Sequence, residues 1–305
     1  MSTAVVDQPL LSAAELAELA AQGALLAQGA LRREVHDHHA GDWPSAWLGR
    51  GLDFEEARPY APGDDVRDMD WRTTARLGHP FIKTYREERQ PLLHIVLDRG
   101  PSMRFGTRRR LKVAQGARLA ALLGFAAAER NVAVGATLWD SPQDRMLGAR
   151  HGRSALLALL QALVEPCAPL PAEAGEAWHE LNRLQTLRAE LPRGSRLLLL
   201  SDFGWLDDRH EGALADLAQL LDLQAVCLSD PAERALPDLG LVCFAGDRGA
   251  PRWLDTGQAA VRAAHAAAFA ERKAQQARRF ARCGVHWREV GSEVDSLLPW
   301  LYAHG

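Results

Sequence analysis

From about residue 91 onward, short apolar runs alternate with longer amphipathic segments. The run at residues 92–98 ends in an acid, and over residues 108–130 apolar residues recur at helical spacing. Further strands are expected at residues 131–139, 196–202, 223–229, 239–244 and 285–290, and further helices at residues 153–164, 211–221 and 258–282. Fully apolar strands fit burial on both faces, and strands that alternate with helices form right-handed crossovers. The pattern therefore predicts an α/β fold class with a doubly wound, mostly parallel, Rossmann-like sheet.

The first 90 residues follow a different pattern. Ser12 and Glu15 have the spacing of a capping box, in which each side chain binds the other residue's backbone N–H, and an Ala- and Leu-rich helix is expected from there to about Arg33. From residue 41 to residue 90, Trp, Pro and Gly interrupt short segments, as is typical of β-hairpins and ordered loops. We therefore expect a helix plus β-rich module at residues 1–90 that packs on an α/β domain at residues 91–305.

Composition and charge exclude several classes of protein. The 305 residues are 47% hydrophobic and 25% charged, with a formal net charge of −3, so nothing global favours nucleic acid or an anionic membrane as a partner. The longest aliphatic run, at residues 197–200, is too short to span a membrane. The four cysteines form no C-x-x-C pair, which is typical of reduced thiols. We expect a cytoplasmic protein.

Two predicted strands end in an aspartate. Asp98 opens the sequence Asp98-Arg-Gly100-Pro-Ser102, and Asp202 follows Ser201. Ligands of parallel sheets bind beyond the carboxyl ends of the strands, so these residues are expected to lie near one point. Carboxylates and hydroxyls grouped in this way suit Mg²⁺. The alternative is that both aspartates cap the segments that follow them.

The common catalytic motifs do not match this chain. It has no phosphate-binding Gly-rich loop with a lysine and no dinucleotide fingerprint, so no nucleotide cofactor is expected. It has no G-x-S-x-G nucleophile elbow. No histidine or second carboxylate follows Asp98 at the spacing of an acid or base. These observations favour a protein that is not an enzyme.

Acids and arginines are dense between residues 42 and 70, where eight acids accompany three arginines. Because the planar guanidinium of arginine matches a carboxylate, this density favours ion pairs that fix loop geometry. The most distinctive positions of this stretch, taken in order, are Arg50, Asp53, Phe54, Arg58, Tyr60, Gly63, Asp64, Asp65, Arg67, Asp70, Trp71 and Arg76.

Together with Asp98, Ser102 and Gly106, these positions closely resemble the domain-of-unknown-function 58 family, from about residue 12 to the C-terminus. The resemblance implies a von Willebrand factor A-like fold with a metal-ion-dependent adhesion site, whose pattern is D-x-S-x-S, a later Thr and a later Asp. Asp98, Ser102 and Asp202 match three of these positions, and Ser154 is the match for the Thr. Gly100 departs from the pattern because it lacks the first hydroxyl.

The resemblance also implies partners. Such proteins are thought to act as adaptors with MoxR-type AAA+ ATPases and other von Willebrand A-like proteins in chaperone-like maturation of proteins, and this chain resembles the short form without membrane helices. Arginines that follow Asp98 would form a rim for a partner: Arg104, Arg108, Arg109 and Arg110. The alternatives are a metal-dependent phosphoester hydrolase and a structural scaffold whose metal site has decayed.

Overall fold

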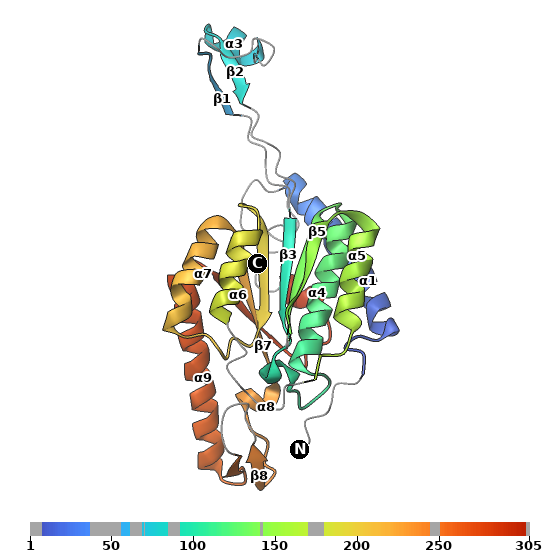
Figure 1. Cartoon of the computed structure of the whole chain (residues 1–305), viewed down its shortest axis with the longest axis vertical. Coiled ribbons are helices and arrows are strands. Elements are labelled where there is room, and N and C mark those ends of the chain that lie inside the picture. Colours follow the sequence, from blue (N-terminus) through green and yellow to red (C-terminus); the bar gives the residue numbers. More distant parts are fainter. Residues whose placement is uncertain are drawn as a thin grey trace. The chain divides into compact units, whose positions relative to one another are not determined.

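The computed structural model describes residues 8–36, 56–61, 69, 71–84, 92–140, 143–169, 180–244 and 251–302. The chain divides into two compact units (Figure 1). The larger unit comprises Met1–Gly49 and Leu92–Gly305, and the smaller one is Arg50–Pro91. The division at Pro91 lies next to the boundary expected from the sequence, but the N-terminal helix belongs to the larger unit. Packing of the smaller unit on the α/β domain stays a prediction.

The centre of the larger unit is a six-stranded sheet with the order β10-β7-β6-β3-β4-β5. All neighbouring strands are parallel except β4 and β5, which are antiparallel. The predicted α/β class with a mostly parallel sheet is therefore confirmed. The strands are β3 (Leu92–Asp98), β4 (Ala133–Trp139), β5 (Arg145–Arg150), β6 (Arg196–Ser201), β7 (Asp222–Ser229) and β10 (His286–Gly291).

Helices cover both faces of this sheet, as the apolar strands require. Two buried clusters result, one on each side (Figure 1). The first cluster joins the sheet to α1 (Ala13–His36), α4 (Lys112–Glu129), α5 (Gly152–Val164) and α10 (Leu297–Tyr302). The second joins it to α6 (Glu180–Glu190), α7 (Asp208–Leu220) and α9 (Ala259–Arg282). Short helical turns complete the unit at η2 (Pro101–Arg104) and α8 (Pro231–Arg234).

Helix α1 begins at the expected capping box. The Ser12 backbone N–H donates to Glu15 Oε2 at 2.9 Å, and the Glu15 backbone N–H donates to Ser12 Oγ at 3.2 Å. The helix packs lengthwise on α4, whose own side chains are almost all buried. Glycine permits the close contacts of α4, since a Cβ at Gly116 would lie 2.6 Å from Leu97 Cδ1 of the sheet. Among the described residues, no helix is both long enough and apolar enough to cross a membrane.

The sequence pattern was wrong about one strand and silent about others. The strand predicted at residues 239–244 does not join the main sheet, because β8 (Leu241–Phe244) pairs with β9 (Arg252–Asp255) in an antiparallel hairpin of its own. Strand β5 was not predicted, because its residues are mostly exposed and lack an apolar alternation. Helix α6 was not predicted either, and it is the most polar of the long helices against the sheet.

The smaller unit contains an antiparallel pair, β1 (Glu56–Pro59) and β2 (Phe81–Thr84), and helix α3 (Trp71–Leu77). The Tyr60 backbone N–H donates to the Pro80 carbonyl at 2.9 Å, and Thr74 Oγ1 of α3 accepts from the Phe81 backbone N–H at 2.9 Å. These bonds tie the helix to the hairpin. The described part of this unit thus contains an antiparallel strand pair, and the connection between its strands includes a helix that the sequence pattern did not predict.

Candidate functional site

The strand order reverses at β3. From β3 the chain proceeds outward to β4 and β5, then returns to the other side of β3 to form β6, β7 and β10. Loops that leave β3 and β6 therefore diverge at this point, which is where open α/β sheets bind ligands. The Leu97 and Leu200 positions of the two strands are paired, so Asp98 and Asp202 come to the same edge. The expected convergence of these two carboxylates is confirmed.

Both carboxylate oxygens of Asp98 accept a hydrogen bond from a nearby group of the protein. Its Oδ1 accepts from the Gly100 backbone N–H at 2.8 Å, and its Oδ2 accepts from Ser201 Oγ at 2.6 Å. The side chain is almost completely buried. Burial, together with the nearby negative charge of Asp202, raises the pKa of Asp98 to about 6. Asp98 is therefore a carboxyl group that changes its charge near neutral pH.

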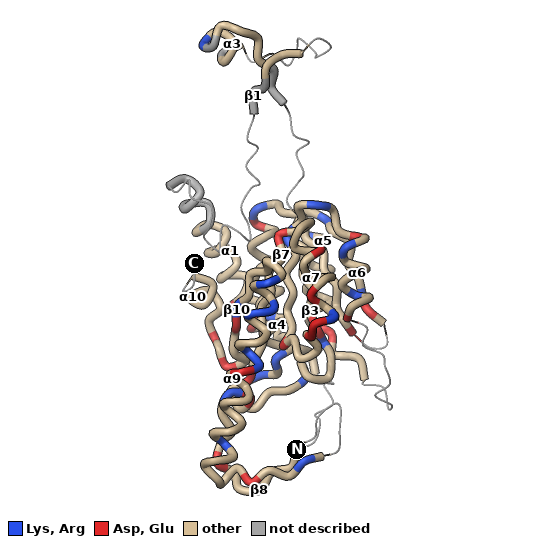
Figure 2. Tube along the Cα trace, turned by 90° about the vertical axis from the view of Figure 1, so that its left-hand side faces the viewer, with Lys and Arg blue, Asp and Glu red and all other residues tan. Residues whose placement is uncertain are grey.

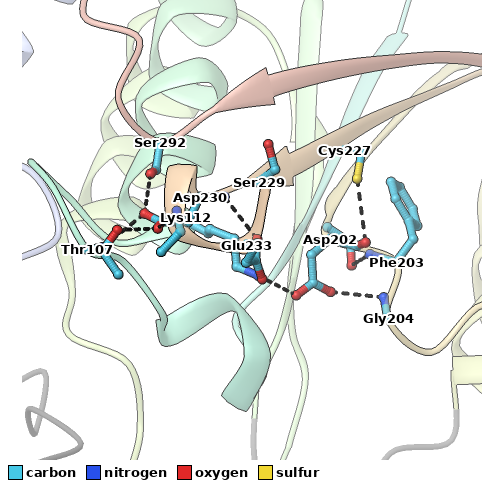
Figure 3. Close-up of polar contacts among 12 residues, drawn as sticks. Thr107, Lys112, Asp202, Phe203, Gly204, Cys227, Ser229, Asp230, Glu233 and Ser292 are labelled. Carbon is cyan, nitrogen blue, oxygen red and sulfur yellow. Dashed lines mark hydrogen bonds and ion pairs between the residues drawn. The ribbon is translucent and has the colours of Figure 1, made fainter. Parts of the chain in front are cut away.

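Asp202 faces a lysine instead of a solvent-exposed site. The Lys112 ammonium, at the first residue of α4, donates to Asp202 Oδ2 at 2.7 Å and to Glu233 Oε1 of α8 at 2.6 Å (Figure 3). Burial by itself raises the pKa of Asp202, but the Lys112 charge and hydrogen bond outweigh it and hold the pKa below its usual value. Burial likewise opposes the charge of Lys112, but Asp202 and Glu233 raise its pKa. The three residues form a buried, charged triad.

The turn after Asp202 has a strained backbone. Phe203 has a φ of 53°, in the left-handed region that bulky residues rarely adopt. Its ring is buried in edge contacts with Trp205 and Phe280, at centroid distances of 5.7 and 4.9 Å. Gln276 of α9 donates its amide to the carbonyls of Asp202 and Phe203, at 3.1 and 2.9 Å. Residues at functional sites often carry such strain. In the same turn the Gly204 backbone N–H donates to Asp202 Oδ1 at 3.0 Å and orients the carboxylate.

A second buried carboxylate, that of Asp230, lies directly after β7. Asp230 accepts from the backbone N–H of Thr107 at 2.9 Å and from Ser292 Oγ at 2.8 Å, and the Thr107 hydroxyl also donates to it (Figure 3). Burial raises its pKa, but these hydrogen bonds, those of Thr107 foremost, lower it on balance. Because Asp230 also caps α8, which carries Glu233, this carboxylate fixes the loop after η2 beside the charged triad.

The structure does not bring all predicted ligands together. Ser102 joins the site, and its hydroxyl is among the groups that lower the pKa of Asp202. Ser154 does not, because it lies in the first turn of α5, near the residues that precede β4. Since β5 runs antiparallel to β4, it carries the chain back to the opposite edge of the sheet. Ser154 is therefore not a ligand of a site at Asp98.

The four arginines of the predicted rim divide into two that are partly buried, Arg104 and Arg110, and two that are exposed, Arg108 and Arg109. Arg104 donates to the Arg99 carbonyl at 3.1 Å and lies 3.6 Å from Asp140. Arg110 donates to the Val294 carbonyl at 2.9 Å, and Arg109 is paired with Asp295. Arg108 is exposed. A partner-binding rim therefore stays a prediction, with Arg108 and Arg109 as its exposed members.

Four of the distinctive positions of the smaller unit lie among the described residues. Tyr60 lies in the hairpin, Trp71 begins α3 with 66% of its surface exposed, and Arg76 lies in the last turn of α3. Arg58 belongs to β1. The remaining positions lie outside the described residues: Arg50, Asp53, Phe54, Gly63, Asp64, Asp65, Arg67 and Asp70.

Three residues of the site were not singled out from the sequence. Ser201 Oγ donates to the Asp98 carboxylate, Glu233 accepts from the Lys112 ammonium, and Gln276 donates to the Asp202 backbone carbonyl. Lys112 was not singled out either. A lysine that opens a helix is unfavourable for the helix dipole, and this was the one signal in the sequence that it has a partner elsewhere.

Comparison with other proteins places the chain in a family. A family model described as "Protein of unknown function DUF58" matches residues 56–275. Over 273 residues the chain is 30% identical to the uncharacterized protein Rv1480 of Mycobacterium tuberculosis (strain ATCC 25618 / H37Rv) and to the uncharacterized protein Mb1516 of Mycobacterium bovis (strain ATCC BAA-935 / AF2122/97). Each alignment covers 86% of this chain and 80% of the relative.

Proposed function

The chain belongs to the DUF58 family, and on this premise we propose that it is a protein-interaction module whose strand-end site binds a partner protein. The observation that carries the proposal is the convergence of Asp98, Ser102 and Asp202 where the strand order reverses. Their geometry is fixed from three sides by Ser201, Lys112 and Gln276. A preorganised polar site of this kind lowers the entropic cost of binding.

The site supports a von Willebrand factor A-like relationship in two respects. The sheet has an antiparallel strand at one edge and reverses its order at the first strand of the α/β domain. Asp98, Ser102 and Asp202 stand where the first Asp, the last Ser and the later Asp of a metal-ion-dependent adhesion site would stand. We therefore propose that the chain is a member of this fold group with a degenerate adhesion site.

Mg²⁺ is the cofactor that this relationship implies, and the residues fit it poorly. Mg²⁺ requires a nearly octahedral shell of oxygens. Asp202 Oδ2 faces the Lys112 ammonium, both oxygens of Asp98 accept hydrogen bonds from the chain, and Gly100 supplies no hydroxyl. A fixed ammonium also repels a dication. We propose that Lys112 supplies the positive charge of the site in this chain.

For the partner, we propose a MoxR-type AAA+ ATPase, toward which the chain acts as an adaptor in protein maturation. The test measures binding of the full chain to the purified ATPase of the same organism by surface plasmon resonance. Ser102→Ala and Asp98→Ala are expected to weaken binding about tenfold or more, because they alter the centre of the site. Asp216→Ala is the control, since Asp216 lies in an exposed ion pair on α7.

The outcome decides between recognition at this site and another role. Circular dichroism of each variant shows whether it is folded, and Ser102→Ala removes only one hydroxyl. If both variants bind the ATPase as tightly as the wild type does, the strand-end site is not the recognition element. The charged triad would then favour the second candidate, a structural scaffold with a decayed metal site.

A hydrolase receives less support from the same geometry. The raised pKa of Asp98 is a feature found in catalytic sites. Its side chain is 5% exposed, however, and both of its oxygens are already hydrogen-bonded. A nucleophile needs an oxygen that reaches the substrate. Turnover of phosphoesters by the wild type and its loss in Asp98→Asn would revive this alternative.

A further inference from the structure

A cavity of about 260 Å³ opens beside the strand-end site. Its walls come from the turn after β6, from α8 and from the middle of α9. Its lining includes Asp202 and Glu233 of the charged triad and Phe269, Arg272 and Lys273 of α9. The cavity therefore shares Asp202 with the proposed recognition site and extends from it to α9.

Two cations of this cavity lack a carboxylate partner within the part of the chain that the structure describes. The Lys273 ammonium donates to Cys227 Sγ at 2.7 Å and to Gln276 Oε1 at 3.3 Å, both of which are neutral acceptors. Burial raises the pKa of the Cys227 thiol to about 12, which keeps it uncharged. The Arg272 guanidinium is exposed and lies 5.9 Å from the centre of the Phe269 ring.

The other charged residues that line the cavity have partners of opposite sign. Asp202 and Glu233 share the single Lys112 ammonium, which leaves one negative charge in the triad. Arg279 pairs with Asp208 and Glu211. Among the described lining residues, Arg272 and Lys273 are therefore the cations without a carboxylate partner, on a helix that carries several other basic residues (Figure 2). Their two positive charges exceed the one negative charge left in the triad.

We propose that this cavity binds a glutamate side chain of an acidic segment in the partner protein. Arg272 and Lys273, which lie 5.9 and 5.2 Å from the centre of the Phe269 ring, would hold the carboxylate, because charge-assisted hydrogen bonds are the strong ones. Phe269 and Leu206 provide an apolar wall for the methylene groups of glutamate. A small inorganic anion has no methylene groups, so it would make no apolar contact with Phe269 and Leu206. The inference rests on the proposed interaction function and specifies the chemistry of the partner.

The test measures fluorescence anisotropy of a labelled hexaglutamate peptide that is titrated with the full chain at low salt. The double variant Arg272→Gln and Lys273→Met is expected to bind the peptide about tenfold more weakly, and each single variant less severely. Added salt is expected to weaken binding to the wild type. Arg278→Gln is the matched control, because Arg278 lies on α9 in an exposed pair with Glu271 and is absent from the cavity wall.

Three results would overturn the inference. The first is a wild type that does not bind hexaglutamate, and the second is equal binding by the double variant and the wild type. The third is displacement of the peptide by an equal concentration of inorganic phosphate, which would indicate a small-anion site. Circular dichroism confirms folding, and Arg272→Gln alone, at an exposed position, serves if the double variant unfolds. If the chain binds the ATPase but not the peptide, only the inference about the cavity is overturned. If it binds the peptide but not the ATPase, only the proposed partner is overturned.

Discussion

Lys112 Nζ lies 2.7 Å from Asp202 Oδ2, so the buried carboxylate at the end of β6 receives its counter-charge from the first residue of α4. The lysine side chain is 1% exposed. Burial of an ammonium is unfavourable unless it is paired and hydrogen-bonded, and here two carboxylates meet that requirement. The pair links the start of α4 to the residue that follows β6.

Lys112→Met is expected to reduce the free energy of unfolding by about 3 kcal/mol, because it leaves Asp202 buried without a counter-charge. Urea denaturation followed by tryptophan fluorescence measures this change. The double variant Lys112→Met and Asp202→Asn should lose less than the sum of the single variants, since the unpaired charge is gone.

Arg188→Met is the control for this comparison. Arg188 and Asp216 form a pair at 3.5 Å in which both side chains are about half exposed. Such surface pairs contribute at most about 1 kcal/mol. Equal effects of Lys112→Met and Arg188→Met would contradict the role of the buried triad.

Asp98 is expected to make stability fall as pH rises. Its folded-state pKa of about 6 lies above its ordinary value, so the folded state retains a proton that the unfolded state has released. This contribution is fully present below about pH 4 and is lost as pH rises through about 6. Asp98→Asn mimics the protonated group and should therefore gain stability relative to the wild type, by on the order of 2 kcal/mol, between about pH 4 and 7.5. If the unfolding free energies of Asp98→Asn and the wild type differ by the same amount at all pH values, the titration of Asp98 does not cause the change.

His94 is expected to act in the opposite direction. It is buried in β3 with Nε2 2.8 Å from Thr137 Oγ1, and burial lowers its pKa to about 4. Because the unfolded chain binds the proton first, this contribution is present above about pH 6.5 and is lost as pH falls toward 4. His94→Gln retains a hydrogen-bonding group without the titration. Its unfolding free energy should therefore decline less between about pH 6.5 and 4 than that of the wild type, and a parallel decline would rule out this origin.

Mg²⁺ is expected to leave the melting temperature of the wild type unchanged, because Lys112 already neutralises Asp202. A ligand that binds only the folded state raises the melting temperature. Lys112→Ala removes the ammonium from both Asp202 and Glu233, and its melting temperature should therefore rise with Mg²⁺ and fall again with EDTA. If Mg²⁺ raises the melting temperature of the wild type and EDTA reverses the rise, the wild type binds the metal and this prediction is wrong.

Much of the fold was predictable because local spacing determines it. The apolar run at residues 92–98 and its successors became β3, β4, β6, β7 and β10, and the capping box at Ser12 opened α1. Strand β5 was not predicted because its residues are mostly exposed and show no apolar alternation. That omission also explains Ser154, since an unrecognised antiparallel strand carries the chain to the opposite edge of the sheet.

The sequence by itself determined that Asp98 and Asp202 meet, because both end parallel strands and the carboxyl ends of such strands share one edge. Only the tertiary structure decided what they meet. Lys112 is 90 residues from Asp202 along the chain, and Glu233 is 121 residues from Lys112. No local pattern encodes a contact over such separations. It arises because packing of α4 on the sheet buries the lysine, and a buried ammonium is stable only beside carboxylates.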